Sequence, residues 1–257
     1  MWKKNHGFTI VELMVSIVMV GIIMASVVTT FSAQSKLSIQ QDRQLEMEDN
    51  LRVATHFVAD AIRNAGYGVP RTNLTTWLSA DTFGTSNVPL FARSSNYIAL
   101  AACSSQSVAT VTSATASLGV TSLTVDSTAS VAVGDTLWIG WSEFAKVTGK
   151  TTYTISFDTN PVSTAGSQGL YRLFPVGTPI CRVNTQTFIV NDVTGRLTYD
   201  PGDGSGAQVL GENMYYMTLQ TMSERRRYRL TMMGKMTDPK TNAVVTNRID
   251  TDVVFVN

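Results

Sequence analysis

The feature that most constrains this chain is a run of 23 residues, Leu13 to Ser35, that contains no formal charge. A transmembrane helix needs about 20 mostly apolar residues, so this run is long enough to span a bilayer. A cleavable secretory signal has a shorter apolar region, of about 7 to 15 residues, followed by a small-residue cleavage site that is missing here. Lys3 and Lys4 precede the run, so the positive-inside rule places the amino end in the cytoplasm. We expect the rest of the chain to be exported.

Glu12 is the acid at the start of the apolar segment. A carboxylate at the bilayer centre costs about 2.5 to 3.5 kcal/mol, so an acid here needs a partner or a place near the interface. The helix dipole also favours a negative charge in the first turn. One interpretation is therefore an acid tolerated at the interface, and the other is an acid with a specific partner.

The residues around Glu12 resemble the class III signal of type IV pilins and pseudopilins. The segment reads Lys3-Lys4-Asn5-His6-Gly7-Phe8-Thr9-Ile10-Val11-Glu12. In that family a prepilin peptidase cuts after the glycine and methylates the new terminal residue, and the apolar helix is retained. The resemblance implies cleavage between Gly7 and Phe8, N-methylation of Phe8, and a role for Glu12 in assembly. The carboxylate would neutralise the Phe8 amine of the same chain or of a neighbouring one, and in the family the neighbour's amine is the partner; such a pair is strong in a low dielectric.

Helical spacing continues beyond Ser35, but in a polar context. Apolar residues recur at steps of four and three residues, as on one face of a helix: Met47, Leu51, Ala54, Val58, Ala61 and Ala65. The remaining face is charged or polar, with Asp49, Arg52, His56, Asp60 and Arg63, which is typical of an amphipathic helix. No proline precedes Pro70, so the two segments can form one helix of roughly 55 residues, ended by Gly66 as a C-cap.

This pattern resembles the pilin architecture, in which an apolar spine protrudes from a globular head. It implies an α+β fold, with a long amino-terminal helix whose first half spans the membrane and whose amphipathic second half packs on an antiparallel β-sheet head. The segment 60–67, Asp-Ala-Ile-Arg-Asn-Ala-Gly-Tyr, is similar to the helix end of PilW-type minor pilins and, less closely, of J-type minor pseudopilins. The expected parts are a leader (1–7), an assembly helix (8–35), an amphipathic helix half (36–69) and a head (70–257).

The head is rich in Ser, Thr, Val and Gly with short alternating runs, a pattern that predicts antiparallel strands. The candidate strands are Tyr97–Ala101, Ser122–Asp126, Thr136–Trp141, Tyr153–Phe157, Gln186–Asn191, Arg196–Asp200, Tyr215–Met222, Arg227–Met233 and Asp250–Val256. Residues 104–132 are weakly amphipathic, and we expect an inserted hairpin or a mobile loop there. A turn at Gly134-Asp135, similar to Val-Gly-Asp turns in PilW-type heads, leads toward Trp138 and Trp141. Strand alternation would point these two rings to opposite faces, which favours core packing over a ligand-stacking pair.

Cys103 and Cys181 are the two cysteines of the chain. No Cys-x-x-Cys spacing occurs, so neither a thiolate zinc site nor a thioredoxin-type pair is expected. An exported chain favours one disulfide between them. The alternative is a pair of separate buried thiols.

Two clusters in the head invite ligand hypotheses. Asp200 and Asp203 lie in a glycine-rich loop that could hold Ca²⁺, but the spacing does not match an EF-hand, and a plain turn between strands is favoured. Arg225, Arg226, Arg227 and Arg229 could bind DNA phosphates, but the cluster is short. A strand edge guarded by charge is the favoured interpretation.

Composition excludes several classes of function. The chain has 20 basic and 19 acidic residues, which is not the strongly basic balance of a nucleic-acid binder. Its two histidines are His6 and His56, and no nucleophile elbow, phosphate loop or His-Glu-x-x-His motif occurs. We expect neither an enzyme nor a cofactor, although chemistry by carboxylates alone depends on which acids converge in space.

The resemblance implies a PilW-like minor pilin that is held in the inner membrane and then assembled into a type IV pilus. Such a subunit would prime or cap assembly and support adhesion, twitching motility or DNA uptake. Its partners would be the major pilin, other minor pilins, prepilin peptidase and the inner-membrane assembly platform. The alternatives are a minor pseudopilin of type II secretion and, from another class, a membrane-anchored periplasmic hydrolase or binding protein.

Overall fold

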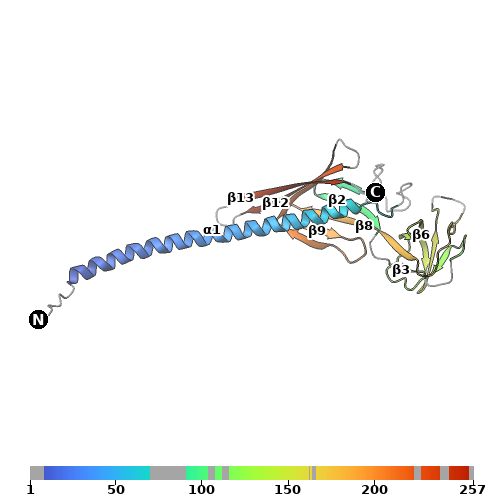
Figure 1. Ribbon diagram of the computed structural model, residues 1–257, viewed down its shortest axis with the longest axis horizontal. Helices are drawn as coiled ribbons and strands as arrows, with labels where there is room; N and C mark the ends of the chain where they lie inside the picture. Colours follow the sequence, from blue (N-terminus) through green and yellow to red (C-terminus); the bar gives the residue numbers. More distant parts are fainter. Residues whose placement is uncertain are drawn as a thin grey trace.

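Figure 1 shows a computed structural model in which one long helix projects from a β-rich head. The structure describes residues 9–69, 91–103, 108–111, 116–161, 163, 166–222, 227–237 and 243–254. The helix, α1, runs without a break from Ile10 to Asn64 over 55 residues. At 1.5 Å per residue its length is about 80 Å. The α+β, pilin-like fold class and the single continuous helix are confirmed.

Only the carboxyl-terminal part of α1 lies in the core. Its buried residues are Met47, Leu51, Ala54, Thr55, Val58, Ala59 and Ile62. The predicted stripe is correct except at Ala61, which is half-buried while its neighbour Ile62 is buried. The buried face is wider than the predicted stripe, because Thr55, Ala59 and Ile62 on its flank also enter the core. Residues 9–46 are all exposed.

Within the described residues there are two sheets, and the larger has ten strands that pair antiparallel. The strands are β1 (Phe91–Ser94), β2 (Tyr97–Cys103), β3 (Ala109–Thr110), β4 (Ser122–Thr124), β5 (Thr136–Ile139), β6 (Glu143–Lys150), β7 (Thr154–Asp158), β8 (Pro179–Asn191), β9 (Arg196–Asp200) and β10 (Gln208–Glu212). The main path is β1-β2-β8-β5-β6-β7-β4; β3 and β9 also pair with β8, and β10 pairs with β9. The smaller sheet has the order β11-β12-β13, with β11 (Met214–Thr221), β12 (Arg227–Thr237) and β13 (Val244–Val254).

The head has two hydrophobic cores, which define two lobes. The proximal lobe packs α1 against β2, β8, β9 and the smaller sheet, around Leu51, Phe188 and Leu230. The distal lobe contains β3 to β7 around Leu137 and Phe157, and lies beyond the end of α1 in Figure 1. β8 belongs to both lobes, because it pairs with β5 near its start and with β2 and β9 farther along.

The described residues of segment 104–132 make one antiparallel bridge with one another, between Val111 and Val125, and otherwise pair with residues outside the segment. They supply β3 and β4, and six of them are buried in the distal core: Ala109, Val111, Ala116, Leu123, Val125 and Val131. β3 pairs with β8 and β4 pairs with β7. The weak local amphipathicity did not indicate this role, because the segment contributes isolated Ala, Val and Leu residues to a core that other strands complete.

The strand predictions were correct in position more often than in length. β9 has the predicted bounds, whereas β8 begins at Pro179 instead of Gln186 and β13 begins at Val244 instead of Asp250. The predicted end of the last strand, Val256, lies outside the described residues. β1, β3, β6 and β10 were not predicted. In β6 the inward residues are Glu143, Ala145 and Val147, and this mixture gives a weak alternation.

Candidate functional site: the amino-terminal half of the helix

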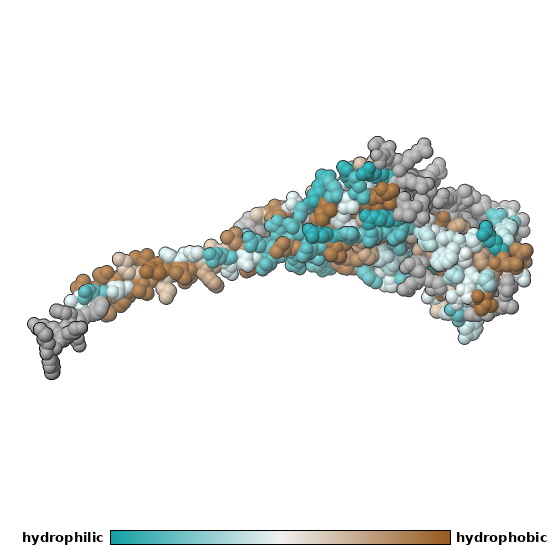
Figure 2. All heavy atoms as spheres, viewed as in Figure 1, coloured by the Kyte–Doolittle hydropathy of each residue, from teal (hydrophilic) through white to brown (hydrophobic). Residues whose placement is uncertain are grey.

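The amino-terminal half of α1 is apolar all round and has no covering. Large hydrophobic side chains stay exposed along it, from Ile10 at 79% to Phe31 at 72%. Figure 2 shows this surface as a mostly brown rod that leads away from the head. Within the described residues, α1 is the one helix long and apolar enough to cross a membrane. Soluble monomers rarely expose a continuous apolar surface of this size, so it needs lipid or other helices around it.

Five hydroxyl side chains in this half donate hydrogen bonds within the helix itself. The hydroxyls of Ser16, Ser26 and Thr30 donate to carbonyl oxygens four residues earlier, at 2.7 to 3.1 Å. Thr29 and Ser32 donate to carbonyls three residues earlier, at 2.8 and 2.9 Å. Apolar surroundings penalise only polar groups that lack a partner. These hydroxyls therefore do not prevent burial of the rod in lipid or among other helices.

Thr9 and Glu12 form a capping box at the start of α1. The Glu12 amide donates to the Thr9 hydroxyl at 3.3 Å. In return the Thr9 amide and hydroxyl donate to Glu12 Oε2 at 3.0 and 2.9 Å. The spacing Ser/Thr-x-x-Glu is a sequence signature of a helix start, and it could have identified this role of Thr9 from the sequence.

The comparisons with known proteins concern the same segment. The model of the prokaryotic N-terminal methylation motif matches residues 2–28. Together with the long apolar helix, the motif is consistent with a type IV pilin-like protein.

No curated protein and no solved structure matches the chain. In general, the motif implies processing by a prepilin peptidase and assembly with other pilins, and with the apolar helix it suggests membrane anchoring. The motif is shared by type IV pilin-like proteins and pseudopilins. The predicted cleavage residues, Gly7 and Phe8, lie outside the described residues.

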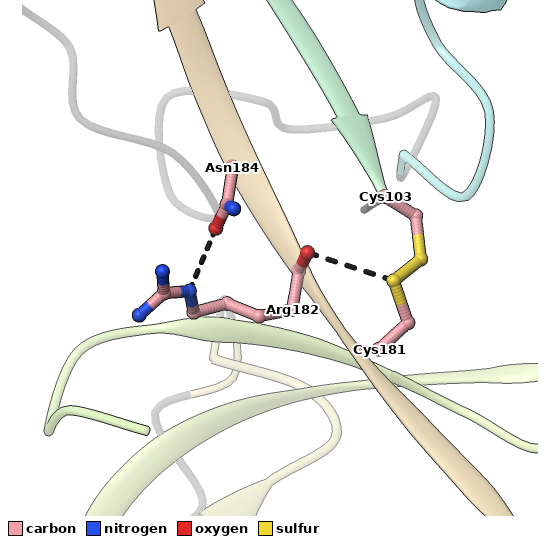
Figure 3. The surroundings of a disulfide bond; sticks show 4 residues. All are labelled: Cys103, Cys181, Arg182 and Asn184. Carbon is pink, nitrogen blue, oxygen red and sulfur yellow. Dashed lines mark hydrogen bonds between the residues drawn. A yellow bond between two sulfur atoms is a disulfide. The ribbon is translucent and has the colours of Figure 1, made fainter. Parts of the chain in front are cut away.

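The two cysteines form a disulfide, drawn in Figure 3. Cys103 ends β2 and Cys181 lies near the start of β8, with their Cα atoms 5.9 Å apart. The Cys103 amide donates to the Tyr67 carbonyl just beyond α1 at 2.7 Å. The bond therefore lies where the helix end, the proximal lobe and the start of the distal lobe meet.

The expectation that Trp138 and Trp141 point to opposite faces was wrong. β5 ends at Ile139, and both Gly140 and Trp141 have positive φ, at 54° and 55°. The strand alternation stops there, and the two rings meet edge to face with centroids 5.1 Å apart. Tyr67 joins them, with its centroid 5.2 Å from that of Trp138. The three rings pack at the junction of the lobes, with Trp138 half-buried and Trp141 exposed.

The Asp200–Gly206 loop is a turn between β9 and β10. Asp200 accepts a hydrogen bond from the Gly202 amide at 2.8 Å, and Asp203 accepts one from the Ser205 amide at 2.9 Å. Hydrogen bonds from Ser205 hold the pKa of Asp203 below its usual value. Over the part of the chain that the structure describes, no group of three or more His, Cys, Asp or Glu could hold a metal ion. The strand after the loop begins at Gln208, earlier than the predicted Tyr215.

Arg227 and Arg229 do not lie on an edge strand, so that interpretation was wrong for these two residues. β12 is the middle strand of its sheet, and Arg225 and Arg226 lie outside the described residues. Arg227 and Arg229 pair with Asp252 on β13, at 3.2 and 2.9 Å. The hydrogen bond from Arg229 lowers the pKa of Asp252. Cross-strand pairing explains these two arginines without a nucleic acid.

Proposed function

We propose that this chain is a PilW-like minor pilin of a type IV pilus. The observation that carries the proposal is the methylation motif at residues 2–28 on a helix whose first half is bare and whose second half is built into a head. The minor pilin would prime or cap assembly and support adhesion, twitching motility or DNA uptake. Its role would be structural and would need neither a catalytic residue nor a cofactor.

The proposed processing and assembly of the chain has two stages. First, the leader 1–7 is removed by prepilin peptidase, Phe8 is methylated, and residues 8–35 hold the subunit in the inner membrane with the amino end in the cytoplasm. Then the assembly platform extracts the subunit, and the helices of the major pilin and of other minor pilins replace the lipid around the apolar half. Both environments cover the same exposed surface, so one helix suits both.

Glu12 can serve two purposes in this scheme. Both Thr9 donors reach Oε2, and no described residue donates to Oε1. A carboxylate has about four acceptor sites, so Glu12 can cap its own helix and still accept the Phe8 amine of a neighbouring subunit. The capping box would hold the carboxylate at a fixed height on the helix, and the charge pair would set the axial register of packed subunits.

A set of three variants separates these two purposes in pili. Glu12→Gln preserves a capping box, because Gln is also accepted at that position, but removes the charge. Thr9→Ala removes the N-cap hydroxyl and keeps the charge, while Glu12→Ala removes the charge and the bonds to Oε2 but leaves the Thr9 hydroxyl to accept from the amide of residue 12. We expect Glu12→Gln and Glu12→Ala to be cleaved normally but reduced at least about tenfold in sheared pili, the equivalent of about 1.4 kcal/mol. Thr9→Ala should still be incorporated. Normal incorporation of Glu12→Gln would contradict the charge-pair role.

The cleavage itself is tested at Gly7. A bulky residue there, as in Gly7→Leu, should leave the leader attached, and a mass spectrum of the purified chain would show it. Normal trimming of Gly7→Leu would count against a prepilin and would favour the signal-anchor of a membrane-tethered hydrolase or binding protein.

A minor pseudopilin of type II secretion is the second candidate, because the matched motif is shared by pseudopilins. Deletion of the chain distinguishes the two. Loss of surface pili with normal secretion of exoproteins supports the minor pilin, whereas the reverse supports the pseudopilin.

A further inference from the structure

A groove runs beside the carboxyl-terminal end of α1, away from the exposed apolar half. It is lined by the helix end, β2, β8 and β9, and includes Phe57, Asp60, Asn64, Tyr67, Gln186 and Tyr199. Its volume is about 600 Å³, within the range of small-molecule sites. Cys103 of the disulfide also lines the groove. Covalent and backbone links thus fix this part of the groove wall.

Exposed aromatic rings line the groove. Phe57 is 42% exposed and Tyr67 is 43% exposed. Phe57 is held edge to face by Tyr199, with centroids 5.1 Å apart, and Tyr67 is held by Trp138 at 5.2 Å. Rings fixed in this way offer a flat apolar contact with little further loss of side-chain entropy on binding.

The polar groups of the groove carry little net charge. Asp60 pairs with Arg63 one turn along the helix, so the two charges offset each other. The side-chain amides of Asn64 and Gln186 make no hydrogen bond to any described residue. Each amide offers both donors and acceptors. Burial raises the pKa of Tyr199, which keeps its hydroxyl protonated.

From these observations we infer that the groove binds a neutral oligosaccharide. A pyranose ring has an apolar C–H face that fits an aromatic ring, and its hydroxyls both donate and accept as the two amides require. A phosphate or sulfate would need more cations than the groove supplies. A purely apolar ligand would bury Asn64 and Gln186 without partners, at a cost in binding.

The test uses the mature full-length chain in detergent micelles that lack a sugar headgroup, so that the detergent does not compete. An array of neutral glycans is screened first, with maltotetraose, cellotetraose and chitotetraose then titrated by saturation-transfer NMR. We expect at least one neutral glycan to bind. Phe57→Leu and Tyr67→Leu keep apolar volume but lose the flat ring, and each should weaken binding about tenfold. Gln186→Ala should weaken it as well.

Tyr153→Leu is the matched control, because Tyr153 is an exposed aromatic of the distal lobe outside the groove. It should bind like the wild type. Thermal unfolding of each variant separates loss of binding from loss of the fold. The inference is overturned if no neutral glycan binds, if the folded groove variants bind like the wild type, or if only sulfated glycans bind. A photo-crosslinker at Asn64 that captures another pilin in filaments, with no glycan binding, also overturns it. The test does not depend on assembly, so it can fail while the proposed minor-pilin role stands.

Discussion

The two halves of α1 share one uninterrupted backbone but lie in opposite environments. Ile10 is 79% exposed in the first half, whereas Met47 and Leu51 are fully buried in the second. The first half is apolar on every side, and the second half has one apolar stripe. Helix formation therefore depends on the local sequence, whereas the distribution of apolar residues around the helix decides what must cover it. The second half is covered by its own head, and the first half requires lipid or neighbouring subunits.

The largest effect is expected from a change in the buried stripe of the second half. Leu51 is fully buried in the proximal core, so Leu51→Ala should reduce the free energy of unfolding of the head by about 2 to 5 kcal/mol. Leu45→Ala is the matched control, because Leu45 lies before the head and is 59% exposed; its cost should stay within about 0.5 kcal/mol. Denaturant unfolding in micelles measures both. Equal losses for the two variants would mean that the halves do not differ as described.

A charge in the apolar half tests whether that half requires lipid or neighbouring subunits. Ile22→Asp places a carboxylate within the uncharged run and should oppose membrane insertion by about 2.5 to 3.5 kcal/mol. Val53→Asp, on the exposed face of the second half, should leave anchoring unchanged. Fractionation of the membrane and soluble proteins measures this difference. Full membrane retention of Ile22→Asp together with normal pili would contradict the role of the first half.

The disulfide lies next to the end of the second half of α1. Cys103 and Cys181 are separated by 78 residues, and this closed loop contains most of the distal lobe. Replacing both cysteines by serine should lower the free energy of unfolding by about 2 to 4 kcal/mol without changing anchoring by the first half. Unfolding with and without a reductant measures the effect. An unchanged midpoint would show that the bond does not stabilise the head.

The smallest expected effect concerns the charged surface that only the head carries. Pairing with Arg229 lowers the pKa of Asp252, so this pair stabilises the head above the unfolded-state value of about 3.9 and its contribution is lost as the pH falls through the lower folded-state value. Asp252→Asn should therefore lower Tm slightly at neutral pH and by less in strong acid. The Tm difference between variant and wild type, followed by calorimetry against pH, checks the sign. A difference that grows on acidification would contradict it.

The sequence predicts the helix better than it predicts the head. The helix, its continuity and its buried stripe were predictable, because residues such as Met47, Leu51 and Val58 recur at helical spacing over a long range. Within the first half, Glu12 and the processing motif were predictable as a resemblance. The capping role of Thr9 was also within reach of the sequence, through the Thr-x-x-Glu spacing.

The head was less predictable because its pairings are not local. Glu143 occupies an inward position of β6, where an apolar residue is expected, so the alternation that predicts a strand is broken. Trp141 leaves the strand pattern because of a turn with positive φ, which no residue count reveals. The groove combines Phe57 on α1 with Gln186 and Tyr199 on two strands. Only the fold brings these three residues together.

In the proposed scheme, the exposed apolar half of α1 is a processed pilin spine that becomes buried in a filament. The most direct measurement is mass spectrometry of sheared, purified pili, searched for the amino-terminal peptide of this chain. The account predicts a peptide that begins at N-methylated Phe8, present at low abundance relative to the major subunit. A chain that still begins before Gly7, or that is found only in the membrane fraction and never in filaments, would contradict it.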